Sequence, residues 1–316
     1  MRHRVFPKIA GPAEAPGAPP PGGPWVALEK IHGAQMVLAA DRDRVRFGKR
    51  KAWLADGDPF FGWQILREPL HAAARAAHEA LGAPTVTLYG ELFGGAYPHP
   101  EVPALPGLAP VQTGIWYAPD LRYALFDVLV AGDEADEGEL LAHREVTALA
   151  AAIGLDVPPL LDAGPRAQIE RVPLRYPTRV PAQLGLPPID GNLAEGVVQK
   201  PDARARPGAR IIYKRKIPEF DEQRFGESEA WDPNQRIDLQ ALLVHARRMV
   251  NPPRLASAAA KWGHADARAL VDEVALDVMI DLAAAFPAAL AALRPDHEEE
   301  LRQAIARAAE AALASA

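Results

Sequence analysis

The chain has 316 residues, of which 49% are apolar and 24% are charged, as in an ordinary globular protein. It contains no cysteine, which excludes disulfides, thiolate metal sites and cysteine nucleophiles. The formal net charge of -6 argues against nucleic-acid binding over the whole surface, but it allows local basic stripes.

The sequence shows no pattern typical of membrane insertion or export. No apolar run approaches the roughly 20 residues that a transmembrane helix needs. The first residues carry positive charge but lack the apolar region of a secretory signal. The nine histidines form no HExxH motif, which disfavours a zinc site. We therefore expect a cytoplasmic location, no membrane partner and a monomer.

In chain order, residues 11–24 are nearly all proline, glycine and alanine, and we expect an irregular leader over 1–24. Three short β-prone runs follow, with Asp41-Arg42-Asp43 as a turn between the last two: PWVALEKI, MVLAA and RVRF. The segment EPLHAAARAAHEALG predicts a helix, because Pro69 lies near its start and Gly82 at its end.

The middle of the chain alternates between the two kinds of element. PTVTLYGELFGG predicts a strand, and YALFDVLVA predicts a more deeply buried one. EGELLAHREVTALAAAIG predicts a helix that Gly154 stops. Residues 157–188 are rich in proline and are expected to be mostly irregular, and AEGVVQKP and ARIIYKRK then predict two further strands.

After about residue 230 the pattern becomes helical. Four segments carry alanine and leucine at helical spacing: RIDLQALLVHARRMV, RLASAAAKWG, DARALVDEVALDVMIDLAAAF and HEEELRQAIARAAEAALA. The sequence therefore predicts an α+β domain over residues 25–226 and a small all-helical C-terminal domain over residues 227–316.

The chemistry-bearing residues begin with EKIHG, residues 29–33, where Lys30 stands at a strand end and Gly33 allows backbone to approach a ligand closely. Taken alone, Lys30 would be a surface lysine and His32 a surface or structurally satisfied histidine. Further polar and aromatic residues on apolar strands strengthen the case for a functional site. Burial of a charged group costs free energy unless the group is paired or binds a ligand. The further residues are Tyr89, Glu91, Phe126, Asp127, Glu195, Lys214 and Lys216.

Lys214 and Lys216 are two residues apart, so on a strand they point to the same side, which suits a polyphosphate. A lysine attacks phosphorus only as the neutral amine, so a nucleophilic lysine needs a pKa below the usual value of about 10.4. Neighbouring cations and partial burial act in that direction. Carboxylates could hold a ribose hydroxyl and hydrated Mg²⁺, and an aromatic ring could stack on a purine.

The motifs EKIHG, FGKR, YGELFGG, LFDV, EGVVQKP and YKRK, in this order, resemble those of the covalent nucleotidyltransferases, and more closely those of the RNA ligase 2 family. The segment DPFFGWQ and the tail MVNPPRLASAAAKWG resemble that family as well, so that the resemblance covers roughly residues 25–265. It implies a nucleotidyltransferase domain of antiparallel sheets and helices, related to the ATP-grasp ligases.

The resemblance also implies the roles of individual residues. Lys30 would carry AMP, and ATP with Mg²⁺ or Mn²⁺ would be required. The nucleotide would be bound by Glu29, Ile31, His32, Arg50, Glu91, Phe126, Glu195, Lys214 and Lys216. Asp127 and Glu195 would support the metal. The RNA, for which a nicked duplex is the favoured substrate and an RNA/DNA hybrid a possible one, would be bound by Gln35, Arg46, Lys200 and Arg254.

The chain departs from the family at two places. Ala34-Gln35 replaces the Thr-Asn that often follows the motif glycine, and Pro252-Pro253 precedes Arg254 where polar residues are usual. The proline-rich residues 97–110 resemble a variable loop.

Three other functions compete with RNA ligation. A DNA nick ligase or a GTP-using capping enzyme would normally carry a β-barrel after the last lysine motif. A helical pattern in that place disfavours both. A catalytically silent protein that binds RNA ends would tolerate the loss of Lys30 or Glu195, and the chain retains both. Two single residues also have purely structural interpretations. Phe126 could be a core residue, and Glu195 could be a carboxylate in a turn.

Overall fold

The computed structural model describes residues 1–7, 9, 23–58, 60–220, 237–262 and 267–314. The chain divides into two compact units. Unit 1 consists of Met1–Leu54, Ala73–Pro103 and Pro110–Glu229, and unit 2 of Ala55–Ala72, Ala104–Ala109 and Ala230–Ala316. The proline-rich residues 11–22 lie outside the described residues.

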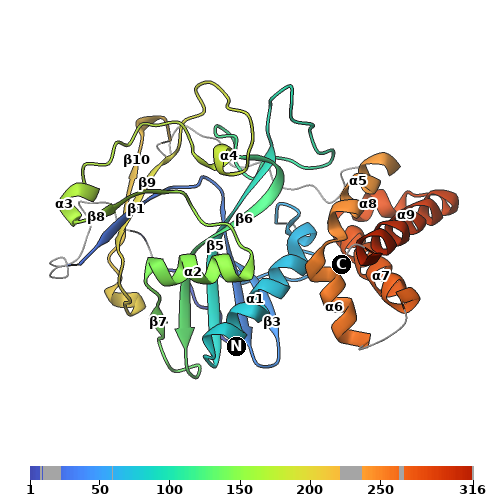
Figure 1. Cartoon of the computed structure of the whole chain (residues 1–316), viewed down its shortest axis with the longest axis horizontal. Helices are drawn as coiled ribbons and strands as arrows, with labels where there is room; N and C mark the ends of the chain where they lie inside the picture. Colours follow the sequence, from blue (N-terminus) through green and yellow to red (C-terminus); the bar gives the residue numbers. More distant parts are fainter. Residues whose placement is uncertain (8, 10–22, 59, 221–236, 263–266, 315–316) are drawn as a thin grey trace. The chain divides into compact units, whose positions relative to one another are not determined.

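Unit 1 contains two sheets, and all their strand pairs are antiparallel, as predicted (Figure 1). The first sheet has the order β10-β9-β1-β8, and the second has the order β4-β3-β2-β5-β6-β7. The strands are β1 (Trp25–Glu29), β2 (Ala34–Asp41), β3 (Val45–Lys49), β4 (Ala52–Trp53), β5 (Thr85–Ala96), β6 (Ala118–Ala131), β7 (Glu139–Leu140), β8 (Leu160–Gly164), β9 (Gly196–Pro201) and β10 (Tyr213–Lys216).

Two predicted helices are present and end where glycine was expected to stop them. Helix α1 (Arg67–Leu81) precedes Gly82, and α2 (His143–Ile153) precedes Gly154. Both glycines have positive φ angles, 60° and 69°, a conformation that glycine adopts without a side-chain clash. The shorter helices of unit 1 are α3 (Arg166–Ile169) and α4 (Val180–Gln183), with one-turn 3₁₀ helices η2 (Pro207–Ala209) and η3 (Pro218–Phe220).

Three local predictions differ from the structure. Helix α2 starts only at His143, because Glu139 and Leu140 pair with β6 as the short strand β7. The stretch expected to be mostly irregular supplies the edge strand β8, since its backbone pairs with β1. Strand pairing covers only Tyr213–Lys216 of the predicted strand ARIIYKRK.

The first sheet presents different residues on its two faces. On one face, Trp25, Ala27 and Val197 form an apolar cluster with Ile169 and Tyr213. On the other face, Val198 packs in a cluster with residues of the second sheet, and Lys200 reaches the carbonyl of Phe126 on β6. This second face is where the sequence motifs of the two sheets meet.

Unit 2 is helical in the residues that the structure describes. Its elements are η1 (Trp63–Leu66), α5 (Leu239–Met249), α6 (Pro252–Trp262), α7 (Ala267–Ala285), α8 (Pro287–Ala291) and α9 (Pro295–Ala314). One core is built mainly from α5, α7 and α9 and includes Leu242, Val274, Val278, Leu282 and Leu301. The predicted helical C-terminal region is therefore confirmed. Within the described residues, no helix is both long and apolar enough to span a membrane.

Candidate active site

Lys30 and Glu195 meet at the end of the β1–β9 ladder. Strand β1 ends at Glu29, which is opposite Val197, and the backbone N–H of Lys30 donates to the carbonyl of Gly196 at 3.0 Å. This hydrogen bond brings the two flanking side chains together, and Lys30 Nζ donates to Glu195 Oε2 at 2.6 Å. The Glu195 side chain is 1% exposed and that of Lys30 is 20% exposed.

Glu195 is shared by two further cationic or titratable groups. Lys216 Nζ lies 3.0 Å from the other carboxylate oxygen, Oε1, and His32 Nδ1 lies 3.6 Å from Oε2. Burial alone would raise the pKa of Glu195, but the charge of Lys30 and the hydrogen bond from His32 outweigh it and lower the pKa to about 2. The carboxylate is therefore ionised and holds the two lysine ammonium groups close to one another.

The strand β10 orients its lysines as predicted. Lys214 is opposite Val198 and Lys216 is opposite Gly196 in the antiparallel ladder. The intervening Arg215 donates to the carbonyl of Glu170, on the other side of the strand. Lys214 and Lys216 therefore share the face on which Val198 packs toward the second sheet.

Gly33 lets the loop after Lys30 touch strand β5. A Cβ atom on Gly33 would lie 2.2 Å from the carbonyl oxygen of Leu92 and 2.9 Å from Glu91 Cγ. The close approach places Glu91 beside the Lys30–Glu195 pair. Burial raises the pKa of Glu91 to about 7, and the negative charge of Glu195 adds to this, while Lys30 opposes it. A carboxyl group at this place can accept or donate a hydrogen bond near neutral pH.

His32 and Ile31 are held by the surrounding core. The His32 backbone N–H donates to the Tyr117 hydroxyl at 2.8 Å, and Tyr117 is buried. Ile31 packs in an apolar cluster with Phe93, Tyr117 and Ile217. The loop that carries the candidate nucleophile is thus fixed on both sides of Lys30.

The side chain of Glu29, predicted to bind the nucleotide, does not join this group. Its carboxylate accepts hydrogen bonds from the Thr178 hydroxyl and from the backbone N–H of Arg179, the latter at 2.8 Å. Burial raises the pKa of Glu29 to about 7. Consecutive residues of a strand point to opposite faces, so Glu29 and Lys30 diverge where β1 ends. Glu29 anchors the 178–180 segment rather than lining the cluster around Lys30.

Phe126 is placed by an irregularity in the β5–β6 ladder. Tyr89 is opposite Asp127 and Gly90 is opposite Leu125, so Phe126 has no partner in the register and forms a β-bulge. A bulge redirects side chains locally, and bulges are common beside active sites. Phe126 is half-buried and packs in one cluster with Val198 of the first sheet. The predicted purine-stacking ring thus lies between the sheets, on the face that Lys214 shares.

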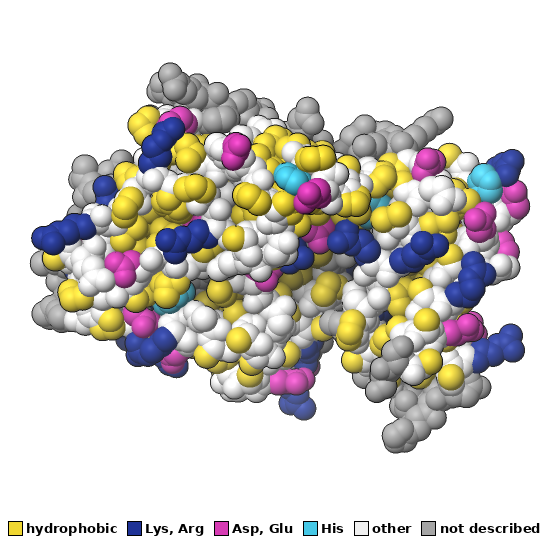
Figure 2. All heavy atoms as spheres, turned by 45° about the horizontal axis from the view of Figure 1, so that its top comes forward, with side chains coloured by type: hydrophobic (Ala, Val, Ile, Leu, Met, Phe, Trp, Pro, Cys, Tyr) yellow, Lys and Arg dark blue, Asp and Glu magenta, His cyan; other side chains and the backbone are white. Residues whose placement is uncertain are grey.

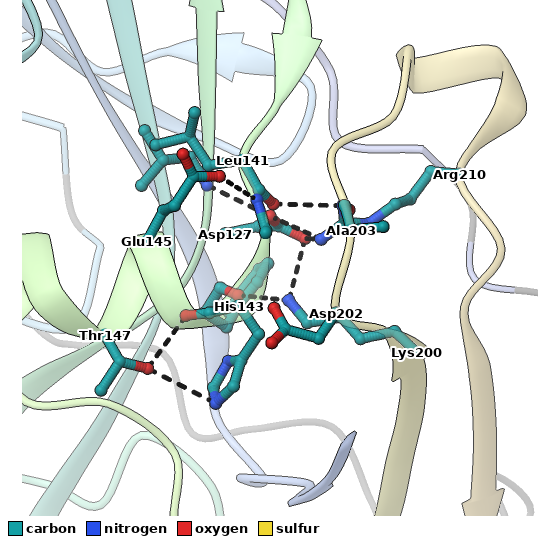
Figure 3. Close-up of polar contacts among 12 residues, drawn as sticks. Asp127, Leu141, His143, Glu145, Thr147, Lys200, Asp202, Ala203 and Arg210 are labelled. Atoms are coloured by element: carbon teal, nitrogen blue, oxygen red, sulfur yellow. Dashed lines mark hydrogen bonds and ion pairs between the residues drawn. The ribbon is translucent and has the colours of Figure 1, made fainter. Parts of the chain in front are cut away.

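Asp127, predicted to support a metal, is instead the centre of a buried ion-pair cluster (Figure 3). Its two oxygens accept from Arg210 Nη2 at 3.0 and 2.9 Å, and Lys200 Nζ donates to Oδ2 at 3.1 Å. The three side chains are 0–3% exposed. Both oxygens of Asp127 are thus engaged by cations of the chain, and a metal at Asp127 would have to displace Lys200 or Arg210. Lys200, predicted to bind nucleic acid, is buried in the same cluster, and its side chain is 3% exposed.

Glu195 is the other carboxylate that the sequence predicts as a metal ligand. No group of three or more His, Asp or Glu side chains in the described residues is arranged to hold a metal ion. Mg²⁺ keeps several waters and is commonly bound by one or two carboxylates together with substrate phosphates. The carboxylate of Glu195, surrounded by lysines that suit phosphate, fits that mode of binding.

The predicted RNA-binding residues lie in different environments. Gln35 is opposite Glu91 in the β2–β5 ladder, and its buried side-chain nitrogen has no hydrogen-bond partner among the described residues. The Arg46 guanidinium lies 4.3 Å from the centre of the Trp53 ring. Arg50, predicted to contact phosphate, is exposed in the turn after β3.

Arg254, in unit 2, is not available to RNA. Its side chain is 1% exposed, donates to Asp281 Oδ2 at 2.5 Å and donates from Nε to the carbonyl of Met249 at 3.1 Å. These contacts tie α6 to α5 and α7. The structure therefore replaces the predicted nucleic-acid role of Arg254 with a structural one.

The sequence contains two basic stripes, residues 42–51 and residues 204–216, and the second is partly neutralised. Arg204 forms ion pairs with Glu139 and Glu145, and Arg210 is buried on Asp127. On the face drawn in Figure 2, the Lys and Arg side chains are dispersed among Asp and Glu. Of the two stripes, the one at residues 42–51 keeps Arg42, Lys49, Arg50 and Lys51 exposed.

Sequence reasoning missed several residues that build the site. They are Tyr117, which holds His32, Thr178, which holds Glu29, and Arg210, which pairs with Asp127. Tyr176 also donates to the Gly196 carbonyl at 2.7 Å, the same oxygen that Lys30 N–H reaches. None of these residues stands in a motif with regular spacing, so only the fold brings them to the site.

The lysines gathered on the buried Glu195, with the half-buried ring of Phe126 between the two antiparallel sheets, suit the phosphates and the base of a nucleotide. A family model described as RNA ligase matches residues 23–216, more than half of the chain. The chain belongs to the RNA ligase family.

Two relatives come from Trypanosoma brucei brucei. The chain is 30% identical over 200 residues to a mitochondrial RNA-editing ligase 2, covering 56% of this chain and 48% of the relative. It is 33% identical over 218 residues to a mitochondrial RNA-editing ligase 1, covering 58% and 46%. The match thus spans about half the length of each relative.

Among solved structures, the chain is similar to that of a Naegleria gruberi RNA ligase mutant with ATP and Mn. The two are 16% identical, the match covers 64% of this chain and 52% of that chain, and the TM-score is 0.43.

Proposed function

We propose that the protein is an ATP-dependent RNA ligase that joins a 3′-hydroxyl to a 5′-phosphate, with Lys30 as the nucleophile. The observation that carries the proposal is the cluster of Lys30, Lys216 and His32 on the buried Glu195, inside the segment that the RNA ligase family model matches. The trypanosomal RNA-editing ligases that share this segment support the same class of substrate.

In the first step, Lys30 Nζ forms a bond to the α-phosphorus of ATP, and the bond from that phosphorus to the pyrophosphate oxygen breaks. The proton that the attacking amine loses passes to solvent, to which the Lys30 side chain is 20% exposed. Lys214 and Lys216 bind the phosphates, and Glu91 binds the ribose. When bound, Mg²⁺ or Mn²⁺ neutralises phosphate charge, and Glu195 is the carboxylate that would hold it.

In the second step, the 5′-phosphate of a strand takes the AMP from Lys30, which recovers its amine. In the third, the 3′-hydroxyl oxygen attacks that 5′-phosphate, and AMP leaves as the phosphodiester forms. The exposed basic residues of the 42–51 stripe would contact the strand backbone and position it. Repair of nicked RNA in the cytoplasm is the role we propose for these steps.

The test is transfer of label from α-³²P-ATP to the denatured protein, with Mg²⁺ and with Mn²⁺. We expect acid-labile label from ATP and not from GTP. Lys30→Ala should abolish it, while Lys51→Ala, which removes an exposed lysine, should leave it unchanged. Full labelling of Lys30→Ala would overturn the assignment of the nucleophile.

Sealing assays would then compare nicked RNA, nicked DNA and hybrid duplexes. Preferential sealing of a nick with RNA at the 3′-hydroxyl side supports an RNA ligase. Equal or better sealing of all-DNA nicks would replace that proposal with a DNA ligase. If labelling fails with both metals and mass measurement shows no AMP already on the protein, the protein is an RNA-end-binding protein rather than an enzyme.

A further inference from the structure

Residues 1–6, called here the N-terminal strap, pack on the second sheet of unit 1 and are not part of any motif used above. Arg4 is 6% exposed, and its guanidinium donates to the carbonyls of Asp133, Asp136 and Glu137 at 3.1, 2.6 and 3.3 Å. Its own carbonyl accepts from the Tyr89 hydroxyl at 3.1 Å. The backbone two residues before Phe6 is therefore fixed at a definite place.

Phe6 is the apolar anchor of the strap. It is 5% exposed, and its ring lies 5.0 Å from that of Tyr89 and 5.1 Å from that of Phe126, between ring centres. The planes of Phe6 and Phe126 are inclined by 76°, an edge arrangement that aromatic rings favour. Phe6 is thus part of the core, while Phe126 remains half-buried.

The contact between Phe6 and Phe126 matters for the proposed nucleotide site because Phe126 is the ring predicted to stack on the purine. As the bulged residue of β6, Phe126 has no register partner on β5. Its cluster contains Phe6 of the strap, Val198 of the first sheet, and Val37 and Leu129 of the second sheet, and the ring of Phe6 lies edge-on against that of Phe126. Lys214, opposite Val198 on β10, belongs to the same face. A base stacked on Phe126 would meet a ring whose orientation depends on Phe6.

We propose that Phe6 is a positioning residue for the purine of ATP, which holds the Phe126 ring in the orientation that stacks on the base. The inference rests on the proposed function and deepens it, since it makes the N-terminal strap a part of the nucleotide site. Phe6 acts through Phe126 and touches no reacting atom. Because Phe6 acts on the base only through the orientation of the Phe126 ring, we expect its loss to weaken purine binding by about two- to tenfold.

The experiment measures binding without chemistry. The full chain would be titrated by calorimetry with α,β-methylene-ATP, which cannot transfer AMP to a lysine, and separately with inorganic triphosphate. Phe6→Leu keeps an apolar side chain in the core but removes the ring. We expect affinity for the ATP analogue to fall about two- to tenfold while affinity for triphosphate stays the same. A merely structural role would change both or neither.

His3→Ala is the matched control within the same strap. The His3 ring is edge-on to that of Trp53, with 4.7 Å between ring centres, and its Nε2 lies 3.0 Å from the carbonyl oxygen of Lys49. It should leave the affinity for the analogue unchanged. If Phe6→Leu fails to fold, Phe6→Met provides a more flexible side chain for the same comparison.

Equal affinity of Phe6→Leu and the unmodified protein for the ATP analogue would overturn the proposal, as would an equal loss for analogue and triphosphate. Absence of any binding of the analogue to the unmodified protein would overturn it too. Binding of the analogue that depends on Phe6, in a protein that never forms lysyl-AMP, would support the strap's role while refuting the ligase function.

Discussion

Lys30 Nζ lies 2.6 Å from Glu195 Oε2, although 165 positions separate the two residues in the chain. Since Lys216 occupies the other oxygen of the same carboxylate, Glu195 holds both ammonium groups at one point. A polyphosphate would compete with Glu195 for these cations, and a divalent metal would compete with them for Glu195. Under the proposed function, binding of ATP with its metal would exchange the partners of Glu195, Lys30 and Lys216 without assembling a new cluster.

Replacing Glu195 tests this exchange. Glu195→Gln keeps the shape of the side chain but leaves Lys30 and Lys216 without their shared counter-charge and removes the carboxylate proposed to hold the metal. We expect the rate of lysyl-AMP formation to fall on the order of 100-fold, as when one charge-stabilising group is removed from an active site. Labelling rates at saturating ATP and metal measure it. A rate equal to that of the unmodified protein would show that Glu195 has no part in the reaction.

Gly33 is expected to be intolerant of any side chain. In Gly33→Ala the new Cβ would lie 2.2 Å from the Leu92 carbonyl, a backbone atom that cannot move without displacing β5. We expect a loss of stability of about 1–3 kcal/mol and a loss of adenylylation, because Glu91 and Lys30 would separate.

Gly208→Ala is the matched control for Gly33→Ala, since nothing lies within 4 Å of a Cβ atom at Gly208. Urea unfolding and labelling compare the two variants. If Gly33→Ala is as stable and as active as Gly208→Ala, the close contact with β5 is not required.

How far the sequence predicts the fold depends on the range of the interactions. Helices α1 and α2 end at glycines that local backbone preference identifies, and the Asp41 turn is closed by its own side chain, which accepts from the N–H groups of Asp43 and Arg44. Strands β7 and β8 were missed because they are defined by pairing with β6 and β1, which no local pattern reports.

The same distinction applies to the site. The motifs predict that Lys30, Glu195 and Lys216 belong to one site, and in the structure the three side chains are in contact. They meet because each stands at the end of a strand of the same sheet. Asp127, predicted as a metal ligand, is paired with two cations, and Arg254, predicted as an RNA ligand, is buried. The sequence did not predict this, because their partners are distant in the chain. A charged residue in a motif can bind a ligand or stabilise the fold. The residue with which it forms an ion pair in the structure distinguishes the two.

The buried Asp127 cluster predicts a large effect on stability. Asp127→Ala would leave Lys200 and Arg210 buried without a counter-charge, and removal of one partner of a buried ion pair costs about 3–5 kcal/mol. Glu139→Gln, which breaks an exposed pair with Arg204, should cost less than about 1 kcal/mol. Urea unfolding of the two variants measures the difference. A stable Asp127→Ala protein with a raised metal requirement would restore Asp127 as a metal ligand.

Burial of Glu29 predicts that the free energy of unfolding depends on pH, and the raised pKa of Glu29 determines the sign of this dependence. The pKa of Glu29 is raised from 4.5 to about 7 in the folded protein, so between these values the folded state binds a proton that the unfolded state has lost. Stability is therefore greatest below pH 4.5 as far as this group is concerned, and it falls as the pH rises to about 7. Glu91, with its pKa also raised to about 7, acts in the same direction.

Glu29→Gln should reduce this decline, because the amide does not titrate and can still bond Thr178 and Arg179. Adding Glu91→Gln should reduce it further. Glu29→Ala should instead lower stability at all pH values by about 1–3 kcal/mol, since the Arg179 N–H and the Thr178 hydroxyl lose their acceptor. Thermal midpoints between pH 4.5 and 7.5 give the slopes. An unchanged slope in Glu29→Gln would mean that Glu29 is not the titrating group, and a selective loss of ATP binding would return it to the nucleotide site.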